Sequence, residues 1–384
     1  MGETEDQGAM RLVYPLLWSR PDRKADRAQS VSTAAALARR GVAVTLLLPR
    51  APGDPALSAD ALRAWFAVEG DFKVVQRPSR WAGEALVRSM LWLRQVFRDP
   101  LLAEVDLLYS RIPAMLGIGR RSPVPFATDQ YRPWPDDWPW IRPLVRRTAR
   151  HTRCLGLILH SHYAVDSYRR AGVPEDKLLV AHNGADPQPM RVATRNQLGL
   201  PADRPVALYT GRVNEEKGLD QILALADLRP EILFVLVGSE GEGVIEAEAA
   251  ARANVRIVPW QAPADLPAWL HAADALLIPP SRAPLEQFRN CILPMKLFSY
   301  LAAGRPILAP AAPDTAELLS DGENALLVPP GDPRAAAAAL DRMLNDPALA
   351  ARLGAAALAQ AQELTWDRRA EKIAAFLEAR LSRR

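Results

Sequence analysis

The sequence predicts two doubly wound α/β domains, each built on a parallel sheet. Short, continuous apolar runs alternate with helical patterns along the whole chain. Such runs are typical of strands buried on both faces by crossover helices. The alternation restarts after the stretch NGADPQPM at 183–190, which carries Pro, Gly and Asn. A length of 384 residues also fits two domains or slightly more, at about 150 residues each.

The first domain is expected over residues 10–185, after a disordered tail at 1–9. Its strands and helices follow from the apolar runs and from the helical spacing between them. The expected strands are 11–17, 42–48, 105–109, 124–128 and 154–159, and the expected helices lie near 28–40, 82–98 and 162–171.

The second domain is expected over residues 186–364. Thr365 is a good N-cap for a last helix over 365–384, in which apolar residues recur with helical spacing. We expect that helix to pack back on the first domain. The other elements expected here are strands at 205–210, 231–237, 254–258 and 274–278, a short strand after Pro306, and helices near 217–227, 263–272, 293–303 and 333–361.

The composition is that of an ordinary soluble globular protein. Apolar residues make up 49% and charged residues 24%, which excludes a mainly disordered chain. No run approaches the roughly 18 apolar residues of a membrane span, and the acidic start MGETEDQGAM is unlike an export signal. The two cysteines, Cys154 and Cys291, are too few for a disulfide framework. We therefore expect a cytoplasmic protein.

Charge is unevenly distributed along the chain. Residues 1–185 hold 27 Lys and Arg against 19 Asp and Glu, whereas residues 186–384 hold 21 against 25. Seven of the ten tryptophans also lie in the first part. The asymmetry indicates a different partner for each half. An Arg-heavy coding bias explains the same numbers equally well.

The motif TGRVNEEKG at 210–218 is the strongest candidate for a binding site. It follows an expected strand and opens an expected helix, and Gly211 permits a tight turn between them. Arg212 and Lys217 would place two cations beside the free backbone N–H groups of a helix start, which is the chemistry that binds a diphosphate. The alternative is a solvated first turn with ordinary surface charges.

A second motif, LPMKLFSYLAAGRPILAP at 293–310, follows the irregular loop 279–292. Pro294 suits the first turn of a helix, and Gly304 ends it. With Lys296, this helix start would be another anion site, or simply a capped helix before a strand. The loop GSEGEG at 238–243 lacks the glycine spacing of a dinucleotide fingerprint. The five histidines form no spaced ligand set, so we expect no metal site.

Together these motifs resemble a known family. The series TGRVNEEKG, NVRIVPW, PMKLFSYLAAGRPILAP and DGENALLVPPGD resembles the C-terminal half of a group 1 (family 4) glycosyltransferase, and the segments at 30–50, 106–113 and 172–186 are similar to its N-terminal half. The resemblance implies a GT-B fold, with two Rossmann-like domains facing across a cleft. It also implies a UDP- or GDP-sugar donor on the second domain, an acceptor on the first, retention of configuration and no metal or other cofactor.

The resemblance also implies roles for single residues. The leaving diphosphate would be bound by Arg212 and Lys217, and Arg111 stands where many members carry a catalytic His. The implied donor-binding residues are Gly211, Pro259, Trp260, Glu286, Cys291, Ile292, Leu293, Lys296 and Ser299, and the implied acceptor-side residues are Arg27, Asp129, Tyr131 and His160.

The sequence departs from the family pattern at several of these positions. The family usually has two Glu eight residues apart where this chain has Cys291 and Ser299, and Glu286 lies nearby at the wrong spacing. A Glu-x-His pattern common in relatives reads Asp129 and Tyr131 here. These changes leave open a non-catalytic GT-B protein that binds a nucleotide or glycan in an assembly. A sugar-nucleotide epimerase of the same architecture is disfavoured by the C-terminal series.

The basic first half then suggests where the acceptor is found. The segment 132–153 combines three tryptophans with six arginines, and 85–98 has a similar mixture. Trp and Arg together suit an anionic membrane surface. We therefore expect a peripheral protein of the inner membrane face that acts on a lipid-linked or lipopolysaccharide-type acceptor. The alternative is a helix that packs its tryptophans into the core, and nucleic acid is not an expected partner.

Overall fold

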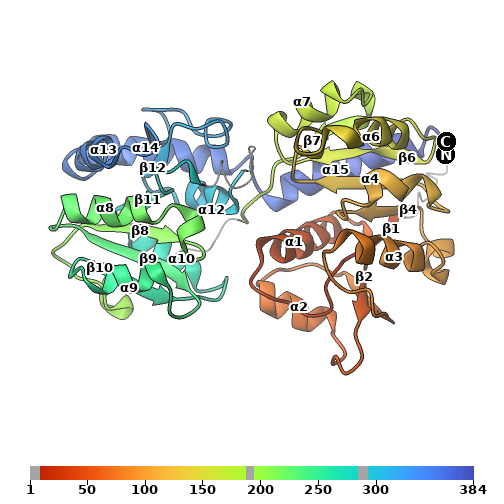
Figure 1. The fold of residues 1–384 in the computed structure, drawn as a ribbon, viewed down its shortest axis with the longest axis horizontal. Coiled ribbons are helices and arrows are strands. Elements are labelled where there is room, and N and C mark those ends of the chain that lie inside the picture. Colours follow the sequence, from red (N-terminus) through yellow and green to blue (C-terminus); the bar gives the residue numbers. More distant parts are fainter. Residues whose placement is uncertain (1–8, 187–193, 284–292) are drawn as a thin grey trace, which may run out of the picture. The chain divides into compact units, whose positions relative to one another are not determined.

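The computed structural model describes residues 9–186, 194–283 and 293–384, which form two compact units. The first unit comprises the chain up to Asn183 together with Trp366–Arg384, and the second comprises Gly184–Thr365. Each unit is a parallel sheet covered by helices on both faces (Figure 1). The predicted fold class is thus confirmed, including the return of the last helix to the first unit.

The first unit contains a seven-stranded sheet in the order β3-β2-β1-β4-β5-β6-β7. All neighbouring strands pair in parallel, and the strand order changes direction beside β1. Its strands are β1 (Arg11–Pro15), β2 (Ala43–Arg50), β3 (Lys73–Pro78), β4 (Leu107–Ser110), β5 (Phe126–Gln130), β6 (Cys154–Leu159) and β7 (Leu178–Val180).

The helices of the first unit divide between the two faces of this sheet. Trp92 of α3, Met115 of α4, Val145 of α6 and Val165 of α7 share one apolar core, so these helices cover one face. On the other face α15 packs along α1 (Figure 1). The helices are α1 (Ala25–Arg39), α2 (Ala59–Phe66), α3 (Leu86–Val96), α4 (Met115–Ile118), α5 (Trp134–Asp137), α6 (Arg142–Ala149), α7 (His162–Arg170) and α15 (Trp366–Leu381), with short 3-10 turns η1 (Pro100–Glu104), η2 (Gly119–Arg121), η3 (Pro139–Ile141) and η4 (Glu175–Lys177).

The second unit contains a six-stranded parallel sheet in the order β10-β9-β8-β11-β12-β13. The strand order changes direction beside β8, which pairs with both β9 and β11. Its strands are β8 (Val206–Thr210), β9 (Leu233–Ser239), β10 (Val255–Pro259), β11 (Ala275–Leu277), β12 (Ile307–Pro310) and β13 (Leu326–Val328).

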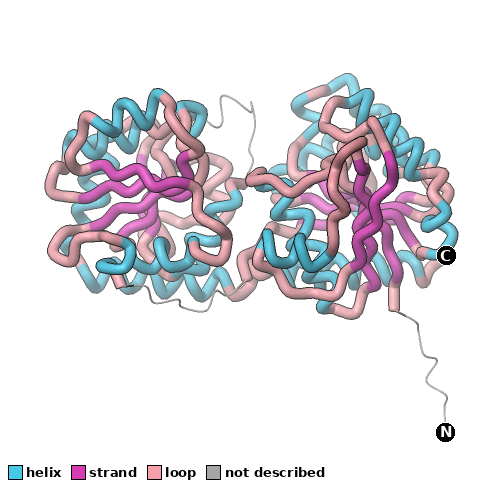
Figure 2. Tube along the Cα trace, turned by 90° about the horizontal axis from the view of Figure 1, so that it is seen from below, coloured by secondary structure: helices cyan, strands magenta, loops and turns pink. Residues whose placement is uncertain are grey.

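Helices also cover both faces of the second sheet, and Figure 2 shows strands between helices in each unit. Trp269 of α10 and Leu297 of α12 belong to one core, whereas Ile222 of α8, Ile245 of α9 and Leu340 of α13 belong to the other. The helices are α8 (Asp220–Leu228), α9 (Val244–Ala250), α10 (Leu266–Ala272), α12 (Met295–Ala303), α13 (Pro333–Asn345) and α14 (Pro347–Ala361), with 3-10 turns η5 (Arg195–Leu198) and η6 (Glu215–Lys217).

The structure corrects the predicted elements in three ways. The helix expected over 333–361 is two helices, because the Asp346 side chain accepts the N–H of Leu349 and Pro347 starts a new first turn. Strands β3, β7 and β13 were not predicted, since β3 is only partly buried and the other two have three residues each. Helices α2, α4, α5 and α9 were missed as well, because each has eight residues or fewer.

The two sheets define where ligands can be recognised. In open parallel sheets, ligands bind beyond the carboxyl ends of the strands, where the strand order changes direction. In the second unit that place is the end of β8 and β11, which carries Gly211 and the start of the loop after residue 278. In the first unit it is the end of β1 and β4, which carries Arg111.

A close backbone approach fixes the end of β8. Gly238 has a φ of +123°, and a Cβ there would lie 2.3 Å from the carbonyl oxygen of Gly211. Gly238→Ala should therefore destabilise the second unit by about 2 kcal/mol or more, because rigid backbone blocks the new methyl group. Gly241→Ala is the matched control. Gly241 also has a positive φ, of +146°, but has nothing within 4 Å.

Chemical denaturation followed by circular dichroism measures the free energy of unfolding of both variants. Gly241→Ala should lower it only by the cost of placing an alanine at a positive φ, which the two positions share. Equal losses in the two variants would show that the contact with Gly211 is unimportant.

Candidate functional site

The end of β8 forms a tight turn that exposes Arg212. Gly211 leaves the strand with a φ of +135°, and its N–H donates to the carbonyl of Val237 at 2.9 Å. The Tyr209 hydroxyl donates to the carbonyl of Arg212 at 2.9 Å, so the buried ring of Tyr209 holds the turn from below. The predicted turn at Gly211 is therefore present, and it is followed by the exposed Arg212. The prediction that the motif opens directly into a helix is wrong, because α8 begins only at Asp220, after the 3-10 turn η6.

Tyr300 joins the two strands at the point where the order changes direction. This buried residue of α12 accepts a hydrogen bond from the N–H of Thr210 at 2.8 Å, and its hydroxyl lies 3.4 Å from the carbonyl of Leu277. It thus binds the ends of both β8 and β11. Because Lys296 lies one helical turn earlier on α12, the same anchor sets the position of that lysine.

Lys296 lies inside the turn. Its Nζ is 3.7 Å from the ring centroid of Tyr209 and 3.0 Å from where a Cβ on Gly211 would lie. Burial, and then the charge of Lys217, lower the pKa of Lys296 well below its usual value. Within the described ranges no carboxylate pairs with Lys296, so the ring face of Tyr209 is the group that stabilises its ammonium.

Lys217 completes a group of three cations with Lys296 and Arg212. It ends the 3-10 turn η6 and is half-buried. Burial and the neighbouring charge of Arg212 lower the pKa of Lys217. Like charges so close together favour an anion, because an anion offsets both the burial and the mutual repulsion. We call Arg212, Lys217 and Lys296 the cation triad.

The other predicted donor residues divide into three groups. Leu293 is buried and Ser299 is half-buried on α12. Pro259 ends β10, and the N–H of Trp260 donates to the carbonyl of Ser239 at 2.9 Å, which places both at the carboxyl edge of the sheet. Glu286, Cys291 and Ile292 lie outside the described residues.

In the first unit, Asp129 is the centre of a buried polar network. Its carboxylate accepts hydrogen bonds from the hydroxyl of Tyr109 at 2.6 Å, Nε2 of His160 at 2.7 Å and Nη2 of Arg369 at 2.7 Å. A longer bond of 3.4 Å comes from the amide of Gln29. Asp129 has no exposed surface, so it acts here by positioning other groups.

Arg369 is the charge partner of this carboxylate. It comes from α15, is 2% exposed, and also donates to the carbonyl groups of Ala181 and His182. Arg369 and His160 together hold the pKa of Asp129 well below its usual value, against the opposing effect of burial. Burial lowers the pKa of His160 to about 4, so the imidazole is neutral and donates from Nε2 to Asp129.

The remaining predicted acceptor residues surround this network. The guanidinium of Arg111 lies 4.9 Å from the ring centroid of Tyr131, and Tyr131 lies 6.5 Å from the ring of His160. Arg111 and Tyr131 are half-buried at the carboxyl edge. Arg27 is instead buried and bonded to carboxylates, with Asp26 at 2.5 Å and Glu84 at 3.0 Å. Its charge is already neutralised.

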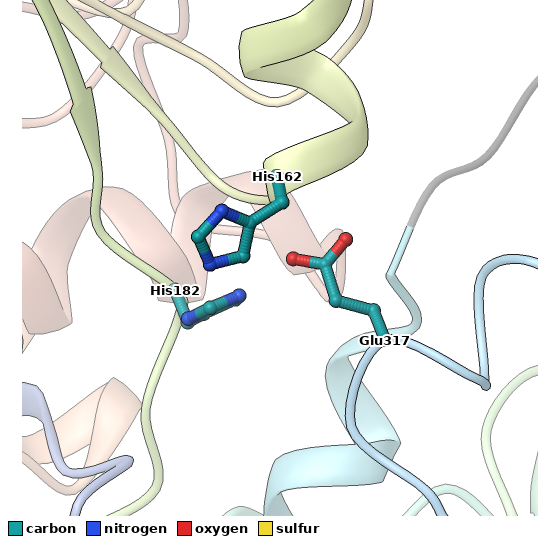
Figure 3. A group of neighbouring side chains, drawn as sticks. All are labelled: His162, His182 and Glu317. Carbon is teal, nitrogen blue, oxygen red and sulfur yellow. The ribbon is translucent and has the colours of Figure 1, made fainter.

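Two further histidines lie near this edge. His162 begins α7 and His182 follows β7, and their rings tilt toward one another with centroids 5.7 Å apart (Figure 3). Two imidazoles are fewer ligands than a zinc site needs, and Glu317 in the same figure belongs to the second unit. The absence of a metal requirement remains a prediction.

Sequence reasoning missed Arg369, Tyr109 and the hydroxyl of Tyr300. A signal for Arg369 was present: it lies four and eight residues before Ile373 and Leu377, so it shares the buried stripe of α15. A charged residue on an apolar stripe needs a buried partner. Asp129 could not be identified as that partner from the sequence, because 240 residues separate the two.

Two family models match consecutive parts of the chain. The model "Glycosyl transferases group 1" matches residues 190–360, and "Glycosyltransferase Family 4" matches residues 30–189. The chain belongs to the group 1, family 4 glycosyltransferases. Among relatives, the D-inositol 3-phosphate glycosyltransferase of Streptomyces scabiei is 33% identical over 214 residues, covering 50% of this chain and 46% of that protein. The D-inositol 3-phosphate glycosyltransferase of Xylanimonas cellulosilytica is 34% identical over 234 residues, covering 56% of this chain and 54% of that protein.

The chain thus spans about half the length of the curated relatives it matches. Solved structures match over nearly all of it. HepE of Anabaena, in complex with UDP, superposes with a TM-score of 0.71 and 18% identity, covering 96% of this chain and 100% of that chain. Sucrose-phosphate synthase of Thermosynechococcus elongatus superposes with a TM-score of 0.72 and 18% identity, covering 98% of this chain and 100% of that chain. At this identity the likeness shows the GT-B fold alone.

Binding of a diphosphate to the cation triad should take up protons. Burial and neighbouring charges lower the pKa values of Lys217 and Lys296, and an adjacent anion would favour their charged forms. Calorimetric titration with a diphosphate that is methylated on both phosphate groups, and so has no ionisation of its own between pH 6 and pH 9, measures this uptake in buffers of different ionisation enthalpy. Affinity should fall as pH rises.

Lys296→Met should remove most of the proton uptake, with Arg342→Met, an exposed residue of α13, as the control. Binding without net proton transfer between pH 6 and pH 9 would contradict the assignment.

His160 should make the first unit acid-sensitive. Its pKa is about 4 in the folded chain against a usual 6.5, so between these values the unfolded chain binds the proton first. The free energy of unfolding should therefore fall by about 3 kcal/mol between pH 7 and pH 4 from this group alone. His160→Gln should flatten that slope, and His162→Gln, at an exposed position, should not.

Tryptophan fluorescence during urea unfolding is the appropriate measurement, since eight of the ten tryptophans lie in the first unit. An unchanged slope in His160→Gln would assign the acid sensitivity to other groups.

Proposed function

We propose that this protein is a retaining, metal-independent glycosyltransferase of the hexosyltransferase type. It moves a sugar from a UDP- or GDP-sugar to a cell-surface glycan or a glycolipid, in polysaccharide or lipopolysaccharide assembly. The observation that carries the proposal is the cation triad at the carboxyl edge of β8 and β11. Family membership supports it, as does the fold shared with the structure of HepE of Anabaena in complex with UDP-glucose.

The triad can supply what the reaction needs at the donor. As the sugar departs, negative charge grows on the diphosphate leaving group, and Arg212 and Lys217 can neutralise it. Such charges, arranged before the reaction, are among the largest contributions to catalysis. Lysine and arginine here would serve in place of a divalent cation. The leaving phosphate oxygen can then take the proton of the acceptor hydroxyl, so no protein nucleophile is required.

The first unit offers the acceptor side. Arg111 and Tyr131 lie half-buried at its carboxyl edge and can contact an acceptor there, whereas Asp129 and His160 support them from below. We propose that the acceptor is presented at the cytoplasmic face of a membrane. Of the described residues, none belongs to a helix long and apolar enough to cross a membrane.

Ser299 favours a second candidate, a GT-B protein that binds a nucleotide or glycan without turnover. It stands where the family usually has a Glu that grips the ribose, and a short hydroxyl can replace only part of that grip. Hydrolysis of donors separates the two candidates. A panel of UDP-, GDP- and ADP-sugars should show slow release of free sugar from at least one donor. Nucleotide binding with no turnover, even with acceptors added, would favour the binding protein.

Removal of single cations tests the proposed mechanism. Arg212→Ala and Lys217→Ala should each lower donor turnover by about 10²–10³-fold, because the leaving diphosphate loses a charge partner. Circular dichroism should remain that of the parent protein, since both side chains extend beyond the sheet edge. Arg334→Ala, at an exposed position of α13, is the control and should keep full turnover. Unchanged kinetics in both triad variants would defeat the assignment.

A further inference from the structure

Exposed apolar and basic side chains lie on α6, at its end and in the segment just before it, in the first unit. Trp140 is 71% exposed, Trp138 41% and Leu144 37%, which is unusual for residues this large. The arginines on the outer face of α6 and at its end are exposed as well. We call this set the α6 surface; it consists of Trp138, Trp140, Leu144, Arg146, Arg147 and Arg150.

The tryptophans of the α6 surface are held rigidly. Trp134 is buried, and its indole N–H donates to the side-chain oxygen of Gln130 at 3.0 Å. Trp138 stacks on Trp134 with ring centroids 4.7 Å apart, and Trp140 follows Trp138 at 6.3 Å. Exposed aromatic rings fixed in this way lose little conformational entropy when they enter another phase.

The charges of the α6 surface are not neutralised from within. Asp136 and Asp137 are the only acidic residues between positions 130 and 165. Asp136 pairs with Arg142 at 3.1 Å and with Arg170 at 2.6 Å, and Asp137 pairs with Arg132. In the three described ranges, no carboxylate pairs with the arginines of the α6 surface.

We propose that the α6 surface docks the protein on a bilayer that contains anionic phospholipid. Trp138 and Trp140 enter the headgroup region, where indole rings are favoured, and Arg146, Arg147 and Arg150 lie over lipid phosphates. Because a few cations or a few apolar groups alone bind membranes weakly, the combination matters. This proposal rests on the proposed function, because docking on a membrane would bring the protein to a lipid-linked acceptor.

The position of the surface agrees with that purpose. Trp134, Trp138 and Trp140 lie in the segment that follows the carboxyl end of β5, and Tyr131 begins this segment. The ring of Tyr131 lies 6.0 Å from that of Trp134. A bilayer touching the tryptophans would therefore lie beside the edge that carries the proposed acceptor residues, so a membrane-bound acceptor need not leave the bilayer.

Co-sedimentation with vesicles tests the proposal on the full chain. The parent protein should bind vesicles of phosphatidylcholine and phosphatidylglycerol, and should not bind phosphatidylcholine alone. The triple variant R146Q/R147Q/R150Q should lose about a hundredfold in partition coefficient. The variant R334Q/R342Q/R352Q is the matched control, since it removes three exposed arginines from α13 and α14 and should bind like the parent.

A second pair of variants tests the contribution of the two exposed tryptophans to vesicle binding. W138A/W140A should bind at least tenfold less well, and W65A should bind normally, since Trp65 is equally exposed, at 41%, but lies on α2. Tryptophan emission should shift to the blue on vesicle binding in the parent and not in W138A/W140A. Thermal unfolding of each variant establishes that the fold is kept.

The proposal is overturned if the parent does not bind anionic vesicles in low salt, or if R146Q/R147Q/R150Q binds as well as its control. It is also overturned if the surface binds RNA or an acidic protein in preference to vesicles. Donor hydrolysis measured without vesicles keeps the two proposals apart. R146Q/R147Q/R150Q should hydrolyse donor at the parental rate, so vesicle binding without hydrolysis would reject only the proposed function.

Discussion

The site of the second unit depends on like charges that the fold holds together. Lys296 and Lys217 repel one another, and each has lost part of its hydration. They stay close because neighbouring groups fix them: the ring of Tyr209 lies against Lys296, and Tyr300 ties α12 to the ends of β8 and β11. In the proposed function, an arriving diphosphate would relieve this repulsion, which would favour its binding.

The first unit arranges its charges in the opposite way. At its carboxyl edge the buried carboxylate of Asp129 is fully bonded, and the charge of Arg27 is neutralised by Asp26 and Glu84. On the outside of this unit, no carboxylate of the described residues pairs with the arginines of the α6 surface. Part of the excess positive charge of the first half is therefore exposed there. In the two proposals, one unit thus presents its charge to a small anion, and the other presents it to the extended surface of a membrane.

The sequence predicted the second site better than the first for a physical reason. Gly211, Arg212 and Lys217 lie within eight residues, so strand, turn and cations can be read from one motif. The network of Asp129 joins β5, β6 and α15, and only tertiary structure brings these together. The edge strands β3 and β7 were missed for a related reason. They are only partly buried, so their sequences lack the continuous apolar pattern on which the prediction relied.

The ion pair of Asp129 and Arg369 also explains why the last helix belongs to the first unit. Breaking a buried pair by removing one partner typically costs about 3–5 kcal/mol, because it leaves an uncompensated charge. Without Arg369, the hydrogen bonds to Asp129 would come only from the neutral groups of Tyr109, His160 and Gln29. The chain therefore crosses between the units twice, and the two crossing segments are joined where the N–H of Ala185 donates to the carbonyl of Leu364 at 3.0 Å. The first unit is complete only when α15 is in place.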